Sequence, residues 1–288
     1  MPSTTPIVVT GATGQFGRAV VESLLDRGVA PDRIVAGGRN LDAAKPLADR
    51  GVDVRRLDYD DPATIADAVA GAGRVLVVSG MDFGRRVEQH LAVARAARDA
   101  GAELVAYTSA PHATTTSMRI AADHAATEAG IRELGVPFTF LRNAWYLEGY
   151  TGRLAVYLAH GVVAASGDGR ISGAARAEQA EAAAVVLTTD GHEGAVYELG
   201  GDESFTQAEL AATVAAASGR PVPYREVSVE ELTATLAATG LPQPVAEIIA
   251  DVDRATRDGA LLIETGDLAR LMGRRTTTLA EAVAAALR

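Results

Sequence analysis

The chain has 288 residues, of which 48% are hydrophobic and 22% are charged, and its formal net charge is −10. This length allows one large domain or two modest ones, and no stretch approaches the ~18 uninterrupted apolar residues of a membrane-spanning helix. The negative charge argues against a general nucleic-acid surface, and the absence of cysteine excludes disulfides, thiol nucleophiles and zinc–thiolate sites. Residues 1–6 lack a basic cluster followed by an apolar run, so we expect no secretory signal and a soluble, cytoplasmic protein.

Short β-branched runs alternate with longer alanine- and leucine-rich segments of helical spacing in the first half of the chain. The runs predict buried strands at 7–9, 34–36, 52–54, 74–78, 104–107 and 138–141. The longer segments predict helices near 15–28, 42–50, 61–71, 84–100 and 117–134. Because parallel strands need crossover connections, the alternation predicts an α/β fold with a Rossmann-like, doubly wound parallel sheet.

The pattern loosens from about Asn143, and a glycine-rich stretch at 161–173 precedes a helix near 176–190 and a strand at 195–199. We expect that helix and strand to return to the sheet. After Gly200 the chain is mostly helical, with breaks at four prolines. The predicted organisation is therefore a Rossmann domain over 1–142, to which 176–200 returns, and a smaller, mostly helical lobe built from 143–175 and 201–288.

A glycine-rich turn directly follows the first predicted strand and opens the first predicted helix. In such a turn the first glycine permits the bend, the second lets the backbone approach a pyrophosphate, and the third lets helix and strand pack closely. The helix N-terminus then faces the phosphates with unpaired N–H groups and the positive end of its dipole. The motif predicts a dinucleotide site. The contacts expected from it are Gly11, Thr13, Gly14, Gln15, Phe16 and Gly17.

The end of the second predicted strand reads Gly37-Gly38-Arg39-Asn40 and contains no acidic residue. An Asp or Glu there would bind the ribose hydroxyls of NAD and repel a 2′-phosphate, whereas Arg39 can pair with that phosphate. We therefore expect NADPH as the cofactor. Lys45, the only lysine of the chain, can add a second positive charge or lie on the solvated surface.

Two further strand ends supply candidate cofactor contacts. After the third strand, Asp58 is the expected adenine-contacting carboxylate with Tyr59 beside it, while Asp60 or Asp61 is expected to cap the next helix. The segment after the fourth strand is expected to pass beneath the nicotinamide ribose, because ligands lie beyond the carboxyl ends of such strands. That segment is Ser79, Gly80 and Met81.

Many enzymes of this fold activate a tyrosine with a lysine four residues later, and this chain has no such pair. The residues four positions after its seven tyrosines are Ala63, Pro111, Tyr150, Leu154, Gly161, Gly201 and Ser228. Any reduction must therefore use another proton source or none. Quinones suit this situation, because water can protonate their stabilised reduced anions.

Segments 10–17, 106–109, 124–128, 141–146 and 191–199 carry a more specific resemblance, which continues to the helix start at 276–279. With them the chain resembles the NmrA-like atypical short-chain dehydrogenases/reductases. Within that family it is most similar to bacterial NADPH:quinone oxidoreductases of type 2 and to triphenylmethane reductases. The resemblance spans nearly the whole chain and implies an NADPH-dependent, flavin-free reductase with a quinone pocket between the large domain and the smaller lobe.

By position in the family, Asn143, Trp145 and Tyr146 follow the sixth strand and are expected to face the nicotinamide. The amide of Asn143 offers donors and an acceptor suited to a quinone oxygen or to the nicotinamide carboxamide. Trp145 and Tyr146 can stack on a flat ring or serve as core aromatics.

His124 and Glu128 lie four residues apart and share one helix face. His124 is a candidate cofactor-ribose ligand or proton donor, and the alternative is a structural histidine bonded to Glu128. Tyr107 and Ser109, at the end of the fifth strand, are candidate pocket residues, Tyr107 in catalysis and Ser109 at the cofactor. Ala129 stands where some quinone reductases of this type carry a lysine after the Thr-Glu pair, so we expect no lysine-assisted step.

The favoured hypothesis is an oxidoreductase that reduces quinones or similar planar conjugated acceptors by direct hydride transfer from NADPH. One alternative is a non-catalytic NADP(H)-sensing regulatory protein, and another is a reductase of triphenylmethane dyes, azo compounds or small carbonyls. We expect no metal, because the remaining histidines lack a ligand spacing. A homodimer is possible, and no nucleic-acid or membrane partner is expected.

Overall fold

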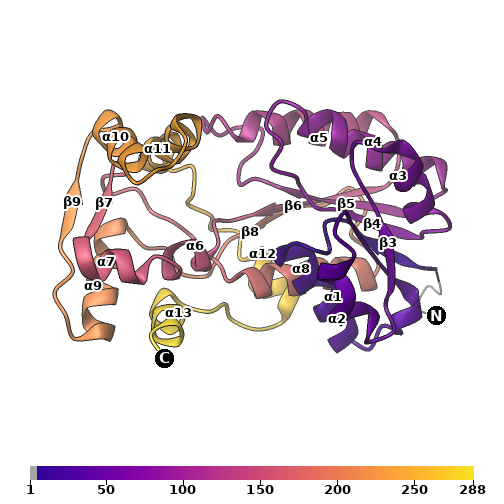
Figure 1. Ribbon diagram of the computed structural model, residues 1–288, viewed down its shortest axis with the longest axis horizontal. Helices are drawn as coiled ribbons and strands as arrows, with labels where there is room; N and C mark the ends of the chain where they lie inside the picture. The colour runs from indigo at the N-terminus through magenta and orange to yellow at the C-terminus, as the bar shows by residue number, and fades with distance from the viewer. Residues whose placement is uncertain (1–4) are drawn as a thin grey trace. The chain divides into compact units, whose positions relative to one another are not determined.

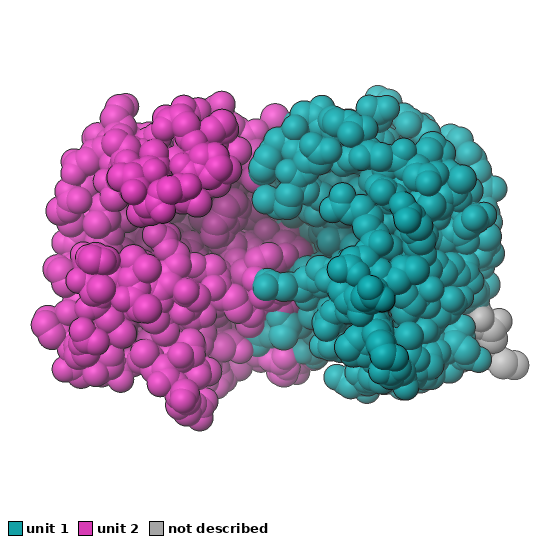
Figure 2. Space-filling view, in the orientation of Figure 1, with its two compact units in different colours: residues 1–110, 123–142, 177–197 teal, residues 111–122, 143–176, 198–288 magenta. Residues whose placement is uncertain are grey.

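The computed structural model describes residues 5–288, so Met1–Thr4, part of the segment assessed for a secretory signal, lie outside the described residues. The chain forms two compact units (Figure 2). The first contains residues up to 110 together with 123–142 and 177–197, and the second contains 111–122, 143–176 and 198–288. Residues 111–122, which the sequence analysis assigns to the Rossmann domain, thus belong to the second unit.

A seven-stranded sheet organises the first unit, in the order β3-β2-β1-β4-β5-β6-β8 (Figure 1). Its neighbouring strands from β3 to β6 pair in parallel. The strands are β1 Ile7–Val9, β2 Ile34–Gly38, β3 Asp53–Arg56, β4 Arg74–Val77, β5 Leu104–Ser109, β6 Phe138–Asn143 and β8 Val196–Leu199. The predicted Rossmann-like α/β fold is confirmed, and β8, which follows α8 in the sequence, lies beside β6 in the sheet.

Helices cover both faces of this sheet, with α3, α4 and α5 on one face and α1, α2 and α8 on the other (Figure 1). Their bounds are α1 Gln15–Asp26, α2 Lys45–Ala48, α3 Pro62–Val69, α4 Arg86–Asp99, α5 Ala121–Glu133 and α8 Arg176–Thr188. The helix predicted near 42–50 is instead a 3-10 turn, Asp42–Ala44, followed by the four-residue α2. Pro46 lies in the first turn of α2 and lacks the N–H that would extend a helix through it.

Branched aliphatic side chains explain why the strands are buried. Val8, Val35, Val75 and Val105 lie side by side on four neighbouring strands and are at most 1% exposed. They belong to one core with Ile65 and other apolar residues of α3, α4 and α5. This core holds the central strands in place, and with them the loops at their carboxyl ends.

The second unit contains helices and a small sheet. Its helices are α6 Leu147–Thr151, α7 Leu154–His160, α9 Gln207–Ser218, α10 Val229–Ala238, α11 Gln243–Arg257, α12 Asp267–Met272 and α13 Leu279–Ala286. Two three-residue strands, β7 Val162–Ala164 and β9 Tyr224–Glu226, pair in parallel. The residue pattern does not predict this sheet, α6 or α7. Among residues 5–288, no helix is both long and apolar enough to cross a membrane.

Capping residues in the local sequence set where several helices of both units begin. The side chain of Thr206 accepts the Glu209 N–H at the start of α9, and Thr278 and Glu281 form the same reciprocal cap at α13. Asp61 caps α3 by accepting two backbone N–H groups, and Pro62 follows in the first turn. Of the two caps expected before α3, the structure therefore selects Asp61.

The junction between β1 and α1 depends on two glycines. Gly11 has a φ of +60°, a conformation that side-chain-bearing residues rarely adopt. A Cβ on Gly17 would lie 2.4 Å from the backbone oxygen of Gly11, so the helix can approach the turn this closely only without a side chain there. The approach brings the first turn of α1 to the end of β1.

We expect Gly17→Ala to lower the free energy of unfolding by about 1–3 kcal/mol, because the added methyl group meets backbone rather than a flexible side chain. Gly149→Ala is the matched control, since Gly149 lies within α6 and its Cβ would meet no atom within 4 Å. Urea unfolding of both variants measures the difference. Equal stability of the two variants would contradict the argument from close approach.

Candidate cofactor and active site

A cavity of about 570 Å³ lies in the first unit, at the carboxyl ends of β1 to β4. It is lined by all the predicted cofactor contacts except Lys45, Ser109 and His124. Six further lining residues are Gly38, Leu57, Asp60, Val78, Asp82 and Gln89. The predicted contacts come from four separate loops, and the structure brings them together around one space.

The turn after β1 presents backbone to this cavity. Gly14 is the N-cap residue of α1 and has no side chain to occupy the space in front of the helix. The Gly14 N–H bonds to the Gly11 carbonyl at 2.9 Å, and the Ala12 N–H bonds to the Gly37 carbonyl at 2.9 Å, which ties the turn to β2. A helix N-terminus held open in this way fits a pyrophosphate.

Arg39 is exposed at the end of β2 and lines the cavity. None of residues 5–288 forms a hydrogen bond or ion pair with its guanidinium, so that group is available to a phosphate. Lys45 lies outside the lining residues, and its Nζ is 3.1 Å from Oδ1 of Asp49, with 74% of the lysine side chain exposed. Its role at the cofactor stays a prediction.

Tyr59 ties the loop after β3 to β1 and β4. Its hydroxyl donates to the Val78 carbonyl at 2.6 Å and lies 2.5 Å from Oγ1 of Thr10, which itself accepts the Val78 N–H. Burial raises the pKa of the Tyr59 phenol, so the group is neutral. Tyr59 thus lines the cavity as a fixed wall, with Asp58 next to it in the chain.

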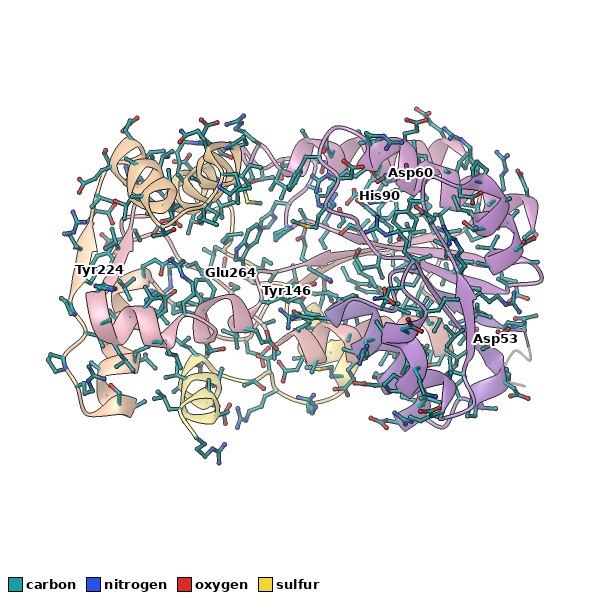
Figure 3. All side chains as sticks on the ribbon, viewed as in Figure 1. Asp53, Asp60, His90, Tyr146, Tyr224 and Glu264 are labelled. Carbon is teal, nitrogen blue, oxygen red and sulfur yellow. The ribbon has the colours of Figure 1, made fainter. Side chains whose placement is uncertain are left out.

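A cluster of two carboxylates and one amide, Asp60, Asp82 and Gln89, also lines the cavity. It is not among the site residues predicted from the sequence. The Gln89 amide donates to Asp60 at 3.0 Å and to Asp82 at 3.2 Å, and Arg85 donates to Asp60 at 2.7 Å. These contacts, the Gln89 bond first, lower the pKa of Asp60. Figure 3 labels Asp60 in this region. Only the tertiary structure brings the loop after β3 to α4, so sequence spacing carries no signal for the cluster.

The loop after β4 is held at two backbone positions. The Ser79 N–H donates to Oγ1 of Thr108 at 2.8 Å, and the Gly80 N–H donates to Nε2 of His90 at 2.8 Å. Met81 follows with 75% of its surface exposed. The loop therefore presents fixed backbone and an apolar side chain to the cavity.

His124 is 7% exposed, and its Nδ1 lies 2.8 Å from the Tyr107 hydroxyl. The hydrogen bonds found for Glu128 go to other residues than His124: its carboxylate binds Arg142 at 2.7 and 2.9 Å and accepts the Ser109 hydroxyl at 2.7 Å. Burial, followed by the positive charge of Arg86, lowers the pKa of His124 to about 3. His124 is therefore a neutral imidazole near pH 7.

Asn143 ends β6 and begins the part of the second unit that contains Trp145 and Tyr146. It is buried, its Nδ2 donates to the Tyr146 hydroxyl at 3.4 Å, and no described residue bonds to its Oδ1. A buried carbonyl oxygen without a partner costs roughly 1–3 kcal/mol, which a ligand donor would recover. The Arg176 guanidinium lies 4.8 Å from the centre of the Tyr146 ring, and Trp145 is half-buried.

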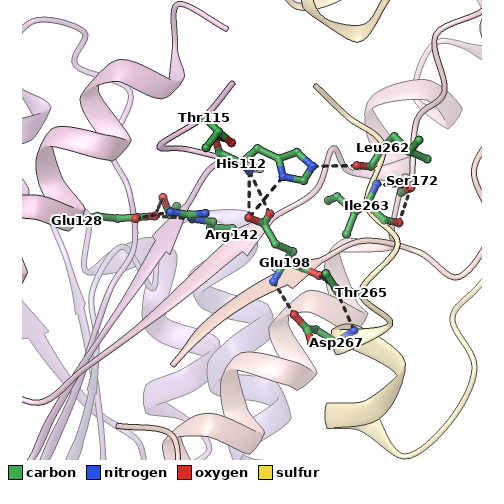
Figure 4. Close-up of polar contacts among 11 residues, drawn as sticks. His112, Thr115, Glu128, Arg142, Ser172, Glu198, Leu262, Ile263, Thr265 and Asp267 are labelled. Atoms are coloured by element: carbon green, nitrogen blue, oxygen red, sulfur yellow. Dashed lines mark hydrogen bonds and ion pairs between the residues drawn. The ribbon is translucent and has the colours of Figure 1, made fainter. Parts of the chain in front are cut away.

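A second polar network joins segments of the second unit (Figure 4). His112 adopts a φ of 49°, its N–H donates to the Glu198 carboxylate at 3.1 Å, and its Nε2 lies 2.8 Å from the Leu262 carbonyl. The Glu198 N–H donates in turn to Asp267 at 2.9 Å. Within residues 5–288 no group of three or more acidic or histidine side chains is arranged to hold a metal.

The family model described as NmrA-like family matches residues 3–266. This chain belongs to the NmrA-like family. It is 42% identical to Quinone oxidoreductase 2 of Escherichia coli (strain K12) over 278 residues, which cover 96% of this chain and 97% of that relative. The predicted family membership is thereby confirmed.

Solved structures of two relatives are similar over nearly the full length. The crystal structure of NADPH-dependent quinone oxidoreductase from Escherichia coli complexed with NADPH has a TM-score of 0.95 and 41% identity, and covers 98% of this chain and 100% of that chain. The Citrobacter sp. triphenylmethane reductase complexed with NADP(H) has a TM-score of 0.91 and 39% identity, covering 97% and 99%.

The buried histidines make the stability of this NmrA-like chain depend on pH. Burial lowers the pKa of His90 to about 4 and that of His124 to about 3, against about 6.5 for exposed imidazole. Between pH 6.5 and these values the unfolded chain binds protons that the folded chain does not. We therefore expect the free energy of unfolding to fall with pH below 6.5, by about 1.4 kcal/mol per pH unit for each histidine.

Urea unfolding at a series of pH values below 6.5 measures this slope. His124→Asn keeps an acceptor near the Tyr107 hydroxyl and should remove the contribution of one histidine. His160→Asn is the control, since His160 is exposed and gains no burial on folding. Identical slopes for wild type and His124→Asn would show that His124 is not held neutral by the fold.

Proposed function

We propose that this chain is an NADPH-dependent oxidoreductase that reduces quinones, or similar planar conjugated acceptors, by direct hydride transfer. The observation that carries the proposal is the cavity in the first unit, which is lined by an open helix N-terminus and by Arg39, whose guanidinium has no partner among residues 5–288. The similarity to quinone oxidoreductase 2 over 96% of the chain supports the choice of acceptor.

The lining residues fit NADPH in chemistry as well as in position. The turn at Gly11–Gly17 would bind the pyrophosphate, because backbone N–H groups and the positive end of α1 favour negative charge. Arg39 would pair with the 2′-phosphate, Asp58 would contact the adenine, and the Ser79–Met81 backbone would bind the nicotinamide ribose. Bound NADPH supplies a hydride, so the reaction needs no flavin.

The residues of this chain position the acceptor rather than activate it with a tyrosine and lysine pair. Asn143 orients the acceptor oxygen or the cofactor carboxamide with an amide whose Oδ1 has no partner among the described residues. Burial raises the pKa of Tyr146, so it acts as a neutral donor or a stacking surface. His124 and Tyr107 are neutral as well, and water protonates the reduced acceptor.

A second acceptor class is favoured by one specific comparison. The Citrobacter triphenylmethane reductase, which was solved with NADP(H), is 39% identical and matches this chain with a TM-score of 0.91. Triphenylmethane dyes carry a delocalised cation that accepts a hydride directly. They share with quinones the property that no proton is needed in the hydride-transfer step.

The test is NADPH oxidation by the purified protein with a benzoquinone, a naphthoquinone or a triphenylmethane dye, followed through the absorbance of the reduced nicotinamide. We expect saturable turnover with quinones, and a loss of roughly tenfold to a hundredfold in kcat for Asn143→Ala, because a positioned amide is removed. Asn40→Ala, which changes an exposed asparagine beside Arg39, is the control. NADPH binding without turnover of any acceptor would favour the sensor instead.

The NADPH preference has its own test. Arg39→Asp should raise the Kd for NADPH by about tenfold to a hundredfold, because a charge-assisted bond to the 2′-phosphate becomes a repulsion. The Kd for NADH should change far less, and calorimetry with both nucleotides measures the two values. Lys45→Ala, tested in parallel, shows whether Lys45 reaches the phosphate. Equal effects of Arg39→Asp on both nucleotides would overturn the assignment of Arg39.

A further inference from the structure

A network of buried, hydrogen-bonded side chains leads from the cavity into the core of the first unit. Its first residue is His90, which has no role in the reaction proposed above. His90 lies in α4 and is 0% exposed. Its Nε2 accepts the Gly80 N–H at 2.8 Å, and its Nδ1 lies 3.3 Å from the Tyr107 hydroxyl and 3.4 Å from Oγ1 of Thr127. The Tyr107 hydroxyl lies 2.8 Å from Nδ1 of His124.

The first bond of this network fixes the tautomer of His90. A backbone N–H can only donate, so Nε2 of His90 must accept from Gly80. A neutral imidazole carries one hydrogen, and in His90 that hydrogen must therefore be on Nδ1. The opposite tautomer would place two donors 2.8 Å apart in the protein interior.

The hydrogen on Nδ1 of His90 affects the hydrogen bonds that Thr127 and Tyr107 can form. Thr127 uses its hydroxyl hydrogen to bond the Asp123 carbonyl at 2.8 Å, so it can only accept from His90. The Tyr107 hydroxyl lies 3.3 Å from the same His90 nitrogen and also contacts Thr127. Its shortest contact is Nδ1 of His124 at 2.8 Å, so we infer that its single hydrogen is donated there. His124 then carries its own hydrogen on Nε2.

We propose that His90 is a positioning residue with two functions: its Nε2 holds the Gly80 amide at the cavity, and its Nδ1 sets, through Tyr107, the tautomer of His124 with the hydrogen on Nε2. The first function keeps the loop after β4 in place where the cofactor is expected. The second makes His124 a hydrogen-bond donor at Nε2. The tautomers are properties of the protein alone, and only the kinetic consequence rests on the function proposed above.

Burial keeps the hydrogen-bonded side chains in one protonation state. Desolvation and the nearby Arg86 charge lower the pKa of His90 to about 4, although Asp123 acts in the opposite direction. The His90 ring also contacts two aromatic rings, that of Tyr59 with centroids 6.1 Å apart and that of Tyr107 with centroids 5.3 Å apart. The imidazole is therefore fixed in position as well as in protonation.

The direct test is a long-range proton–nitrogen correlation spectrum of isotope-labelled protein, which distinguishes protonated from unprotonated ring nitrogens. We expect His90 to carry its hydrogen on Nδ1 and His124 on Nε2 at neutral pH. Tyr107→Phe should leave the His90 tautomer unchanged and allow both tautomers of His124. Tyr197→Phe, which removes the hydroxyl bonded to His192 at 2.8 Å, is the matched control and should change neither.

Two substitutions of His90 separate its two functions. In His90→Asn the side-chain amide can replace the Nδ1 donor but does not reach Gly80, so the His124 tautomer should be kept while hydrogen exchange at the Gly80 amide becomes faster. In His90→Gln the side-chain oxygen can replace the Nε2 acceptor, so the Gly80 amide should stay protected while His124 populates both tautomers. Circular dichroism and thermal unfolding show whether each variant is folded.

The proposal is overturned if wild-type His90 carries its hydrogen on Nε2, if Tyr107→Phe leaves the His124 tautomer unchanged, or if His90→Asn and His90→Gln have the same pattern of effects. In the quinone assay we expect His90→Asn to raise the KM for NADPH about fivefold, as the loss of one hydrogen bond would. Absence of turnover in the wild type would refute the proposed function and leave the tautomer result standing.

Discussion

Parallel strand pairing is the constraint from which the site of this protein follows. Strands β1 to β6 run in one direction, so their carboxyl ends meet at one edge of the sheet, and every loop that leaves this edge is available to one ligand. The core of branched aliphatic residues against the sheet fixes the strands, and hydrogen bonds from Tyr59, Thr108 and His90 hold the loops after β3 and β4. The cavity is therefore a product of topology, and the glycine turn is the sequence feature that keeps it open.

Most polar groups around the first unit's cavity and in the core behind it form hydrogen bonds or ion pairs with other protein groups. Few charged groups are therefore left without a protein partner among the described residues. Tyr59 is held by Thr10 and a backbone carbonyl, and the Glu128 carboxylate is neutralised by Arg142 beneath the end of β6. A buried carboxylate can keep its charge only when such a partner is present. Arg39 stands out by contrast as an exposed cation with no protein partner among the described residues, which is the arrangement that a phosphate ligand requires.

Much of the fold and of the lining of the cavity could be predicted from the sequence, because both depend on local patterns. The run Ile7–Val9 followed by Gly11, Gly14 and Gly17 specifies strand, turn and helix within a few neighbouring residues. Strands β7 and β9 could not be predicted, because each has only three residues and its partner strand lies about sixty residues away in the sequence. The roles of Gln89 and His90 could not be predicted for a similar reason. In the sequence they are two polar residues of a helix, and their hydrogen-bond partners come from other loops and strands.

The last strand of the main sheet arrives late in the sequence. β8 spans Val196–Leu199 and bonds to β6, which ends at Asn143, so the chain builds part of another unit before it completes this sheet. During synthesis β6 remains an open edge with unpaired backbone groups until about fifty further residues have emerged. A nascent chain stalled in this interval would expose a template for strand addition by other chains.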